Sequence, residues 1–119
     1  MSNPQPVGML DSGVGGLAVL REVRRLLPQE SIIYVGDQGH VPYGPRARDE
    51  IRAFTTGIVQ FLIDQHCKAI VIPCNAACAA GLHHVRALFP NVPIVGMEPA
   101  IKPAVEHTKT GIIGVITTQ

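Results

Sequence analysis

The sequence has little charge and few aromatic side chains. Only 16% of its residues are charged, tryptophan is absent, and there are 2 tyrosines and 3 phenylalanines. The formal net charge is +1. The arginines cluster only in two short groups, at positions 21–25 and 46–48. Such short groups are typical of solvated helix faces, so we expect no nucleic-acid partner.

Long hydrophobic runs and paired cysteines are lacking as well. No apolar run approaches the ~20 residues of a membrane span, and Met1–Pro6 has no basic start followed by an apolar stretch, as a signal peptide would. The cysteines, Cys67, Cys74 and Cys78, are odd in number and unpatterned, which indicates free thiols in a reducing compartment. We therefore expect a soluble cytoplasmic domain without membrane contact.

The sequence does contain enough apolar material for one compact core, since 46% of its 119 residues are hydrophobic. Short runs rich in valine and isoleucine alternate with amphipathic segments. The expected strands are Val7–Leu10, Ile32–Val35, Ala69–Ile72, Pro93–Val95 and Ile112–Ile116. The expected helices are Leu17–Leu27, Ala47–Gln65 and a third that begins just after Cys74 and reaches Phe89. This alternation predicts an α/β fold of three layers, with helices on both faces of a parallel sheet.

The alternation of expected strands and helices changes near the end of the chain. Pro99 and Pro103 interrupt it between Glu98 and Lys109, and a polar turn precedes the last expected strand. A parallel sheet normally continues from such a strand into a covering helix, and none follows here. The sequence is therefore interpreted as a truncated chain.

Ligands of open parallel sheets bind beyond the carboxyl ends of the strands, and the first loop there is Asp11–Gly16. Its glycines fit a tight turn in which Asp11 or Ser12 caps the next helix. The spacing Gly-x-Gly-x-x-Ala of residues 13–18 also fits a relaxed dinucleotide fingerprint, with Asp37 in the ribose-binding place. A carboxylate beside a pyrophosphate is unfavourable, so nucleotide binding is the weaker of these interpretations.

Two further loops carry candidate residues. Gly36–Arg46 is longer than the usual connection of ~2–6 residues. Tyr43 lies in it between a proline and a glycine and is expected to lean over a small ligand. His40 is either a general base or a solvated side chain. After the fourth strand, Glu98 is either a functional carboxylate or, as we favour, a charge at a helix N-terminus.

Cys74 follows a buried strand and begins a helix. Unpaired N–H groups and the positive end of the helix dipole lower the pKa of a thiol in that position. Asn75 adds an amide beside it, and an ordinary buried cysteine is the alternative interpretation. If the chain starts at the centre of the sheet, the first and third strands are neighbours, which brings Asp11 next to Cys74. A carboxylate beside a thiol suits proton abstraction better than phosphate binding.

Together these loops resemble the glutamate racemase branch of the aspartate/glutamate racemase family. The matching segments, in the family's order and spacing, are Asp-Ser-Gly-Val-Gly-Gly-Leu, Tyr-Val-Gly-Asp with Val-Pro-Tyr-Gly, Cys-Asn, and Gly-x-Glu-Pro-Ala. The resemblance implies racemisation of glutamate without pyridoxal phosphate, other cofactor or metal, and supply of D-glutamate for peptidoglycan, cell wall biogenesis and cell shape. The implied partner is the small-molecule substrate, and a homo-oligomer is compatible with it.

The resemblance also implies roles for individual residues. Family members place one cysteine on each side of the substrate Cα, and Cys74 would be one of them, assisted by Asp11. The residues that would hold the substrate's amino and carboxylate groups are Ser12, Tyr43, Gly44, Asn75 and Ala76.

Two residues depart from the family pattern. Ala76 stands where the family normally has threonine, which removes a hydroxyl from the site, and His40 stands where arginine is usual. Ala76, together with a second lobe that this sequence lacks, favours a second hypothesis, in which the chain is a non-catalytic remnant that binds a small acid.

The resemblance further implies that residues 1–98 form an incomplete first lobe, and that residues 99–119 form a linker helix and the first strand of a second lobe. The second catalytic cysteine would lie in that second lobe, beyond Gln119. We therefore expect the 119-residue chain alone to be inactive, to expose apolar surface, and to be marginally stable or self-associated.

Overall fold

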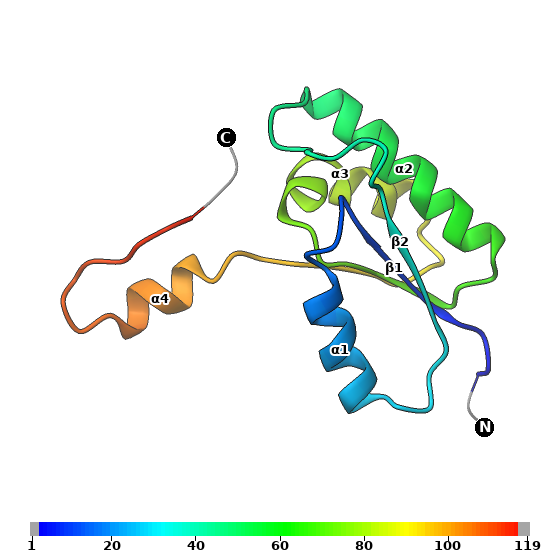
Figure 1. Cartoon of the computed structure of the whole chain (residues 1–119), viewed down its shortest axis with the longest axis horizontal. Coiled ribbons are helices and arrows are strands. Elements are labelled where there is room, and N and C mark those ends of the chain that lie inside the picture. The colour runs from blue at the N-terminus through cyan, green and yellow to red at the C-terminus, as the bar shows by residue number, and fades with distance from the viewer. Residues whose placement is uncertain (1–2, 117–119) are drawn as a thin grey trace.

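The computed structural model describes residues 3–116, which form four strands and four helices in alternation (Figure 1). In chain order they are β1 (Val7–Asp11), α1 (Leu17–Leu26), β2 (Ile32–Gly36), α2 (Arg48–Asp64), β3 (Ala69–Ile72), α3 (Asn75–Leu88), β4 (Ile94–Gly96) and α4 (Ile101–His107). None of the helices in this part of the chain has the length and hydrophobicity needed to cross a bilayer. The first four expected strands and the first three expected helices are confirmed, each with bounds within one residue.

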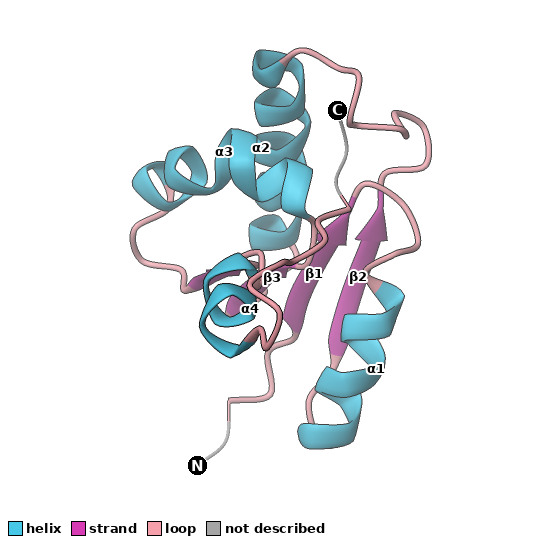
Figure 2. Ribbon diagram, turned by 90° about the vertical axis from the view of Figure 1, so that its left-hand side faces the viewer, coloured by secondary structure: helices cyan, strands magenta, loops and turns pink. Residues whose placement is uncertain are grey.

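The four strands form one parallel sheet in the order β2-β1-β3-β4. Strand β1 is central, and Val7 is in register with Ile32 of β2 and with Ala69 of β3. Figure 2 shows α2 and α3 on one face of the sheet and α1 on the other, which confirms the predicted α/β layers. Because β1 and β3 are adjacent, the residues that follow them meet at one edge of the sheet.

The core lies between the sheet and the α2–α3 pair. Leu10, Ile70 and Ile72 are fully buried there against Val59 and Leu62 of α2. Helix α1 differs, since none of its residues is buried although its apolar side chains recur at helical spacing. The sheet face beneath α1 is consequently covered less completely than the opposite face.

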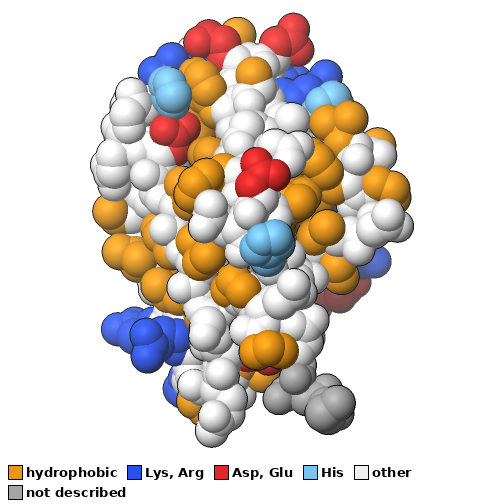
Figure 3. All heavy atoms as spheres, turned by 90° about the vertical axis from the view of Figure 1, so that its right-hand side faces the viewer, with side chains coloured by type: hydrophobic (Ala, Val, Ile, Leu, Met, Phe, Trp, Pro, Cys, Tyr) orange, Lys and Arg blue, Asp and Glu red, His pale blue; other side chains and the backbone are white. Residues whose placement is uncertain are grey.

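Charged side chains are dispersed over the surface. On the face shown in Figure 3, lysine and arginine side chains lie at separate places between hydrophobic and neutral ones. Arg25, in the arginine-rich part of α1, pairs with Glu22 at 2.9 Å. This face therefore carries no continuous basic patch.

The prediction of a strand at residues 112–116 is wrong. This segment follows α4 as chain without secondary structure, and its Ile112 is 78% exposed. Figure 1 shows α4 and the following segment standing away from the sheet. A strand needs a neighbour for its N–H and C=O groups, and none lies beside this segment within residues 3–116. Residues 117–119 lie outside the described part of the chain.

Two glycines allow the loop after β1 to pack closely against its neighbours. A Cβ atom on Gly36 would lie 2.7 Å from the carbonyl oxygen of Gly13. A Cβ atom on Gly16 would lie 2.8 Å from the Tyr34 hydroxyl and 2.9 Å from Pro73. All three distances are too short for real contacts, so the ends of β1, β2 and β3 can approach this closely only with glycine at both positions.

Replacement of Gly36 by alanine is expected to lower the free energy of unfolding by ~1–3 kcal/mol, because the added methyl group meets a backbone carbonyl that cannot rotate away. The matched control is Gly57→Ala in α2, where nothing lies within 4 Å of the added carbon. It should be neutral or stabilising by up to ~1 kcal/mol. Urea denaturation of both variants tests this difference, and equal midpoints would contradict the close-packing argument.

Candidate active site

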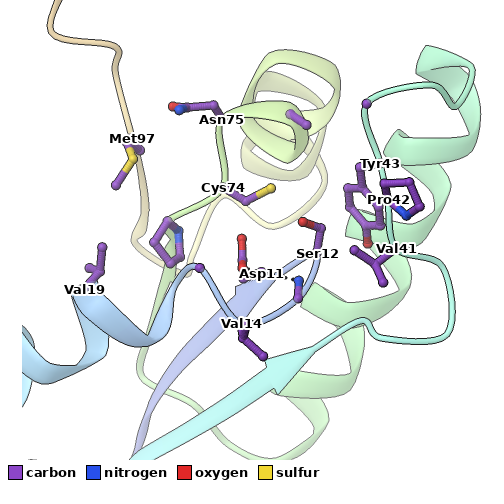
Figure 4. Close-up of a pocket in the computed structure, with 15 residues that line it drawn as sticks. Asp11, Ser12, Val14, Val19, Val41, Pro42, Tyr43, Cys74, Asn75 and Met97 are labelled. Carbon is purple, nitrogen blue, oxygen red and sulfur yellow. Dashed lines mark hydrogen bonds between the residues drawn. The ribbon is translucent and has the colours of Figure 1, made fainter. Parts of the chain in front are cut away.

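A cavity of about 480 Å³ opens at the carboxyl ends of the strands (Figure 4). Residues from all four loops beyond those ends contribute to it. They are Asp11, Ser12, Gly13, Val14, Gly15, Val19, Val41, Pro42, Tyr43, Gly44, Pro73, Cys74, Asn75, Ala76 and Met97. All seven residues that the sequence analysis assigned to catalysis or substrate binding therefore lie around one space.

Asp11 ends β1 and is only 5% exposed. Its Oδ2 accepts hydrogen bonds from the backbone N–H groups of Gly13, at 3.2 Å, and Gly16, at 3.0 Å. The N-cap of α1 is Gly16, without a side-chain cap. The expectation that Asp11 or Ser12 caps this helix is thus wrong, because Asp11 instead binds the loop that leads to the helix.

This arrangement argues against a dinucleotide site. In such sites the amides of the glycine loop face the pyrophosphate. Here two of these amides already bind the carboxylate of Asp11, whose negative charge would repel a phosphate. The carboxylate of Asp37 is likewise engaged, since it accepts a hydrogen bond from the Tyr43 hydroxyl.

Cys74 is the N-cap of α3, as its position after β3 predicted. Its backbone is extended, and its Sγ accepts a hydrogen bond from the N–H of Ala77 at 3.5 Å. The residue is buried but lines the cavity. Figure 4 shows its sulfur, the Asp11 carboxylate and the Ser12 hydroxyl around the same central space. The predicted juxtaposition of Asp11 and Cys74 is therefore present.

Asn75 and Ala76 form the rim next to Cys74. Asn75 is exposed, and Figure 4 shows its amide pointing away from the Cys74 sulfur. Ala76 is half-buried and presents a methyl group to the cavity. This part of the wall therefore lacks a side-chain hydroxyl.

The other two cysteines do not line the cavity. Cys67 precedes β3 at the opposite end of the sheet and lies beneath Gly8, and burial raises the pKa of its thiol. The Cys78 thiol donates to the carbonyl of Ile72 at 3.2 Å and accepts from the N–H of Met97 at 3.3 Å. Burial outweighs the latter hydrogen bond and raises the pKa of Cys78. Both thiols thus occupy structural positions.

Tyr43 forms the wall opposite α1 and is 2% exposed. Its hydroxyl donates to Oδ2 of Asp37 at 2.6 Å. Burial, followed by this hydrogen bond and the Asp37 charge, raises the pKa of Tyr43 far above its usual range. Tyr43 is consequently a neutral phenol at all physiological pH values, and its only hydroxyl hydrogen is directed at Asp37.

His40 and Glu98, the other candidates of the sequence analysis, lie outside the cavity lining. His40 contacts Asp37 through Nδ1 at 2.8 Å and stacks on Phe54 of α2. Glu98 is exposed and precedes Ala100, the N-cap of α4, so it lies outside the first turn of that helix. The assignment of Glu98 to a helix N-terminus is therefore wrong.

Sequence reasoning missed several lining residues, among them Val19, Val41 and Met97. Val19 lies within the first expected helix and carried no further signal, and the other two lie in loops whose course depends on the fold. Across residues 3–116 no group of three or more His, Cys, Asp or Glu side chains is arranged to hold a metal ion.

Residues 12–119 match the family model of Asp/Glu/Hydantoin racemases. The chain is 53% identical over 113 residues to a glutamate racemase of Ectopseudomonas mendocina, covering 95% of this chain and 43% of that protein. The structure is similar to Escherichia coli glutamate racemase in complex with L-glutamate and the activator UDP-MurNAc-ala, with TM-score 0.84 and 38% identity over 91% of this chain and 41% of that one.

Francisella tularensis glutamate racemase in complex with D-glutamate is similar with TM-score 0.75 and 39% identity, covering 78% of this chain and 35% of that chain. The chain therefore spans less than half the length of these proteins.

The three thiols should differ in reactivity. Iodoacetamide is expected to alkylate Cys74 first under native conditions, since Cys74 faces the cavity while the raised pKa values of Cys67 and Cys78 leave less thiolate at neutral pH. Peptide mass spectrometry resolves the three sites, and labelling in guanidinium, where the sites become equivalent, is the control. Earlier modification of Cys78 would contradict the assignment.

Proposed function

Because the chain belongs to the Asp/Glu/Hydantoin racemase family, we propose that it forms the first lobe of a glutamate racemase. The observation that carries this proposal is the position of Cys74 and Asp11, on adjacent strand ends in one cavity. The proposed reaction is cofactor-independent exchange of the Cα proton of glutamate in the cytoplasm, which supplies D-glutamate for peptidoglycan.

The proposed base is the thiolate of Cys74. The Cα proton of an amino acid is only weakly acidic, so its removal requires a positioned base and fixed groups that stabilise the developing negative charge. Asp11 lies where it can orient the thiol and exchange its proton. Its Oδ2 is held by two amides, and Oδ1 has no hydrogen-bond partner among the described residues.

The proposed substrate contacts come from three of the loops that line the cavity. Ser12 comes from the loop after β1, Tyr43 and Gly44 from the loop after β2, and Asn75 and Ala76 from the start of α3. Asn75 and Ala76 also begin α3, where free backbone N–H groups and the helix dipole favour a carboxylate. A negatively charged amino acid would therefore place one carboxylate at this helix terminus, beside Cys74.

The two-thiol reaction requires a second cysteine on the opposite face of the substrate. Cys67 lies at the other end of the sheet, and Cys78 is held between Ile72 and Met97. Neither can supply that proton. In the proposal, residues 1–98 form the first lobe, residues 99–119 lead into a second lobe, and the second thiol comes from that lobe.

A chimera tests whether this lobe is catalytically competent. Residues 1–119 replace the matching segment of the Ectopseudomonas mendocina glutamate racemase, and circular dichroism monitors conversion of L- to D-glutamate. We expect turnover, and a loss of at least ~10²-fold in Cys74→Ser, because a positioned general base contributes that much or more. Cys78→Ser, the matched control, should retain activity.

The 119-residue chain alone should show no turnover, since only one thiol faces the cavity. A folded chimera that binds glutamate without converting it would instead support the second candidate, a non-catalytic remnant that binds a small acid. The observation in favour of that candidate is the methyl group of Ala76 at the rim.

Ala76→Thr should strengthen catalysis in the same chimera. A hydroxyl hydrogen-bonded to a charged carboxylate contributes ~1.5–3 kcal/mol, which corresponds to a rise in kcat/KM of about tenfold or more. Ala79→Thr makes the same chemical change on an exposed part of α3 outside the cavity and should have no such effect. Equal kcat/KM values for the two variants would exclude a carboxylate contact at position 76.

A further inference from the structure

Tyr34 lies close to the candidate active site without lining it. It is the third residue of β2, in register with Met9 of β1, and its side chain is half-buried. On the side of the sheet that α1 covers, it borders a second cavity, of about 390 Å³, together with Leu20 and Arg24. Tyr34 is not among the residues around the cavity that contains Cys74, so a ligand held there does not contact it.

The Tyr34 hydroxyl binds the glycine loop that follows β1. It donates a hydrogen bond to the carbonyl oxygen of Gly13 at 3.0 Å. It also lies against Gly16, where an added Cβ atom would come within 2.8 Å of the hydroxyl oxygen. Burial, followed by the negative charges of Asp11 and Cys74, raises the pKa of Tyr34, and a backbone hydrogen bond from Gly16 offsets this only in part. The hydroxyl consequently keeps the hydrogen that it donates.

Gly13 is therefore held by two neighbouring strands. Its N–H donates to Oδ2 of Asp11, at the end of β1, and its C=O accepts from Tyr34 of β2. Because a peptide group is planar, the first bond fixes the orientation of the peptide between Ser12 and Gly13. For the same reason the second bond fixes the peptide between Gly13 and Val14. The backbone is thus fixed on both sides of Gly13.

The composition of the loop makes the second attachment necessary. Three of the four residues 13–16 are glycine, which can adopt backbone conformations that other residues rarely do. Oδ2 of Asp11 is bonded to two amides of this loop, so a rotation of the loop would move the carboxylate with it. Figure 4 shows the carboxylate and the Ser12 hydroxyl facing the space beside the Cys74 sulfur. Both groups keep that position only while the loop keeps its conformation.

We propose that Tyr34 is a positioning residue of the racemase site. Its hydroxyl holds the carbonyl of Gly13, and the loop in turn holds the Asp11 carboxylate and the Ser12 hydroxyl towards Cys74. Tyr34 thus affects the chemical step without contacting the substrate. This inference rests on the proposed function for the identity of the reaction, whereas the attachment of the loop is a property of this chain alone.

The first experiment examines the loop without reference to activity. Tyr34→Phe removes the hydroxyl and keeps the ring, and hydrogen exchange in the chimera is followed by mass spectrometry of peptides that cover residues 12–16 and 69–72. Exchange in the loop peptide should accelerate about two- to twelvefold, the factor that corresponds to the loss of one hydrogen bond. Exchange in the β3 peptide should not change. An unaltered loop peptide, or an equal acceleration in β3, would overturn the proposal.

The matched control for this experiment is Tyr43→Phe. It removes the hydroxyl of the only other tyrosine in the chain, which binds Asp37 rather than the glycine loop. Exchange in the peptide of residues 12–16 should therefore stay at the parent rate. The same acceleration in both variants would refute a specific role of Tyr34.

The second experiment measures kcat and KM for glutamate in the chimera. A displacement of about 1 Å in a reacting group costs up to ~10²-fold, so Tyr34→Phe should lower kcat by about 10- to 100-fold and change KM less. Thr56→Val is the matched control, since it removes a hydroxyl that binds the carbonyl of Arg52 within α2, away from the cavity. Its kcat should equal that of the parent. An unchanged kcat in Tyr34→Phe would refute the positioning role.

A double variant distinguishes positioning from a general effect on stability. If Tyr34 acts through Asp11, adding Tyr34→Phe to Asp11→Asn should lower kcat by no more than about twofold further, because residues that act as a unit are not additive. A merely structural role would give the same fractional loss in both backgrounds, and that result would overturn the proposal.

The two experiments separate the possible failures. An inactive chimera in which Tyr34→Phe accelerates loop exchange would count against the proposed function and support the attachment of the loop by Tyr34. An active chimera in which Tyr34→Phe leaves kcat unchanged would support the function and refute the role of Tyr34.

Discussion

The carboxylate of Asp11 is the group around which this site is built. It is buried at the end of the central strand, and a buried charge must be compensated by hydrogen bonds. Two amides of the glycine loop supply them, so the loop folds around the carboxylate. The loop also brings Gly16 close to Tyr34 and Pro73, beside the cavity that Cys74 lines. The glycines thus make room for a small ligand, and their amides are unavailable to a phosphate.

Cys74 and Cys78 carry the same thiol group, but their different contacts give them different roles. Both lie at the start of α3, about one helical turn apart. Cys74 caps the helix and faces the cavity, whereas Cys78 is hydrogen-bonded to the ends of β3 and β4. The first position suits an exchangeable proton. The second position suits a thiol that joins a helix to the sheet. For this reason Cys74, and not Cys78, is proposed as the one catalytic thiol that this chain supplies.

Some residues of the loop 36–46 line the cavity, and others support them from outside it. Tyr43 and Gly44 line the cavity, while Asp37, His40 and Arg46 hold them from outside through hydrogen bonds and contacts with Phe54. Sequence reasoning weighed Asp37 as a turn cap or ribose ligand and His40 as a base or solvated side chain. Neither pairing with Tyr43 nor stacking on α2 leaves a periodic signal in the sequence, since both depend on where an irregular loop meets a helix.

The sequence by itself determined the α/β layers and seven of the residues around the cavity, among them Asp11 and Cys74. Hydrophobic periodicity and strand-end positions are local properties, and the rule that a central first strand neighbours the third brought Asp11 beside Cys74. Only the tertiary structure decided which groups the polar side chains bind. In it, Asp11 binds the loop amides and the Tyr43 hydroxyl binds Asp37. Glu98 is exposed to solvent, and residues 112–116 have no strand partner among the described residues. Hydrogen bonds between loops and between strands require partners distant in the chain, whose positions follow from the packed fold rather than from local pattern.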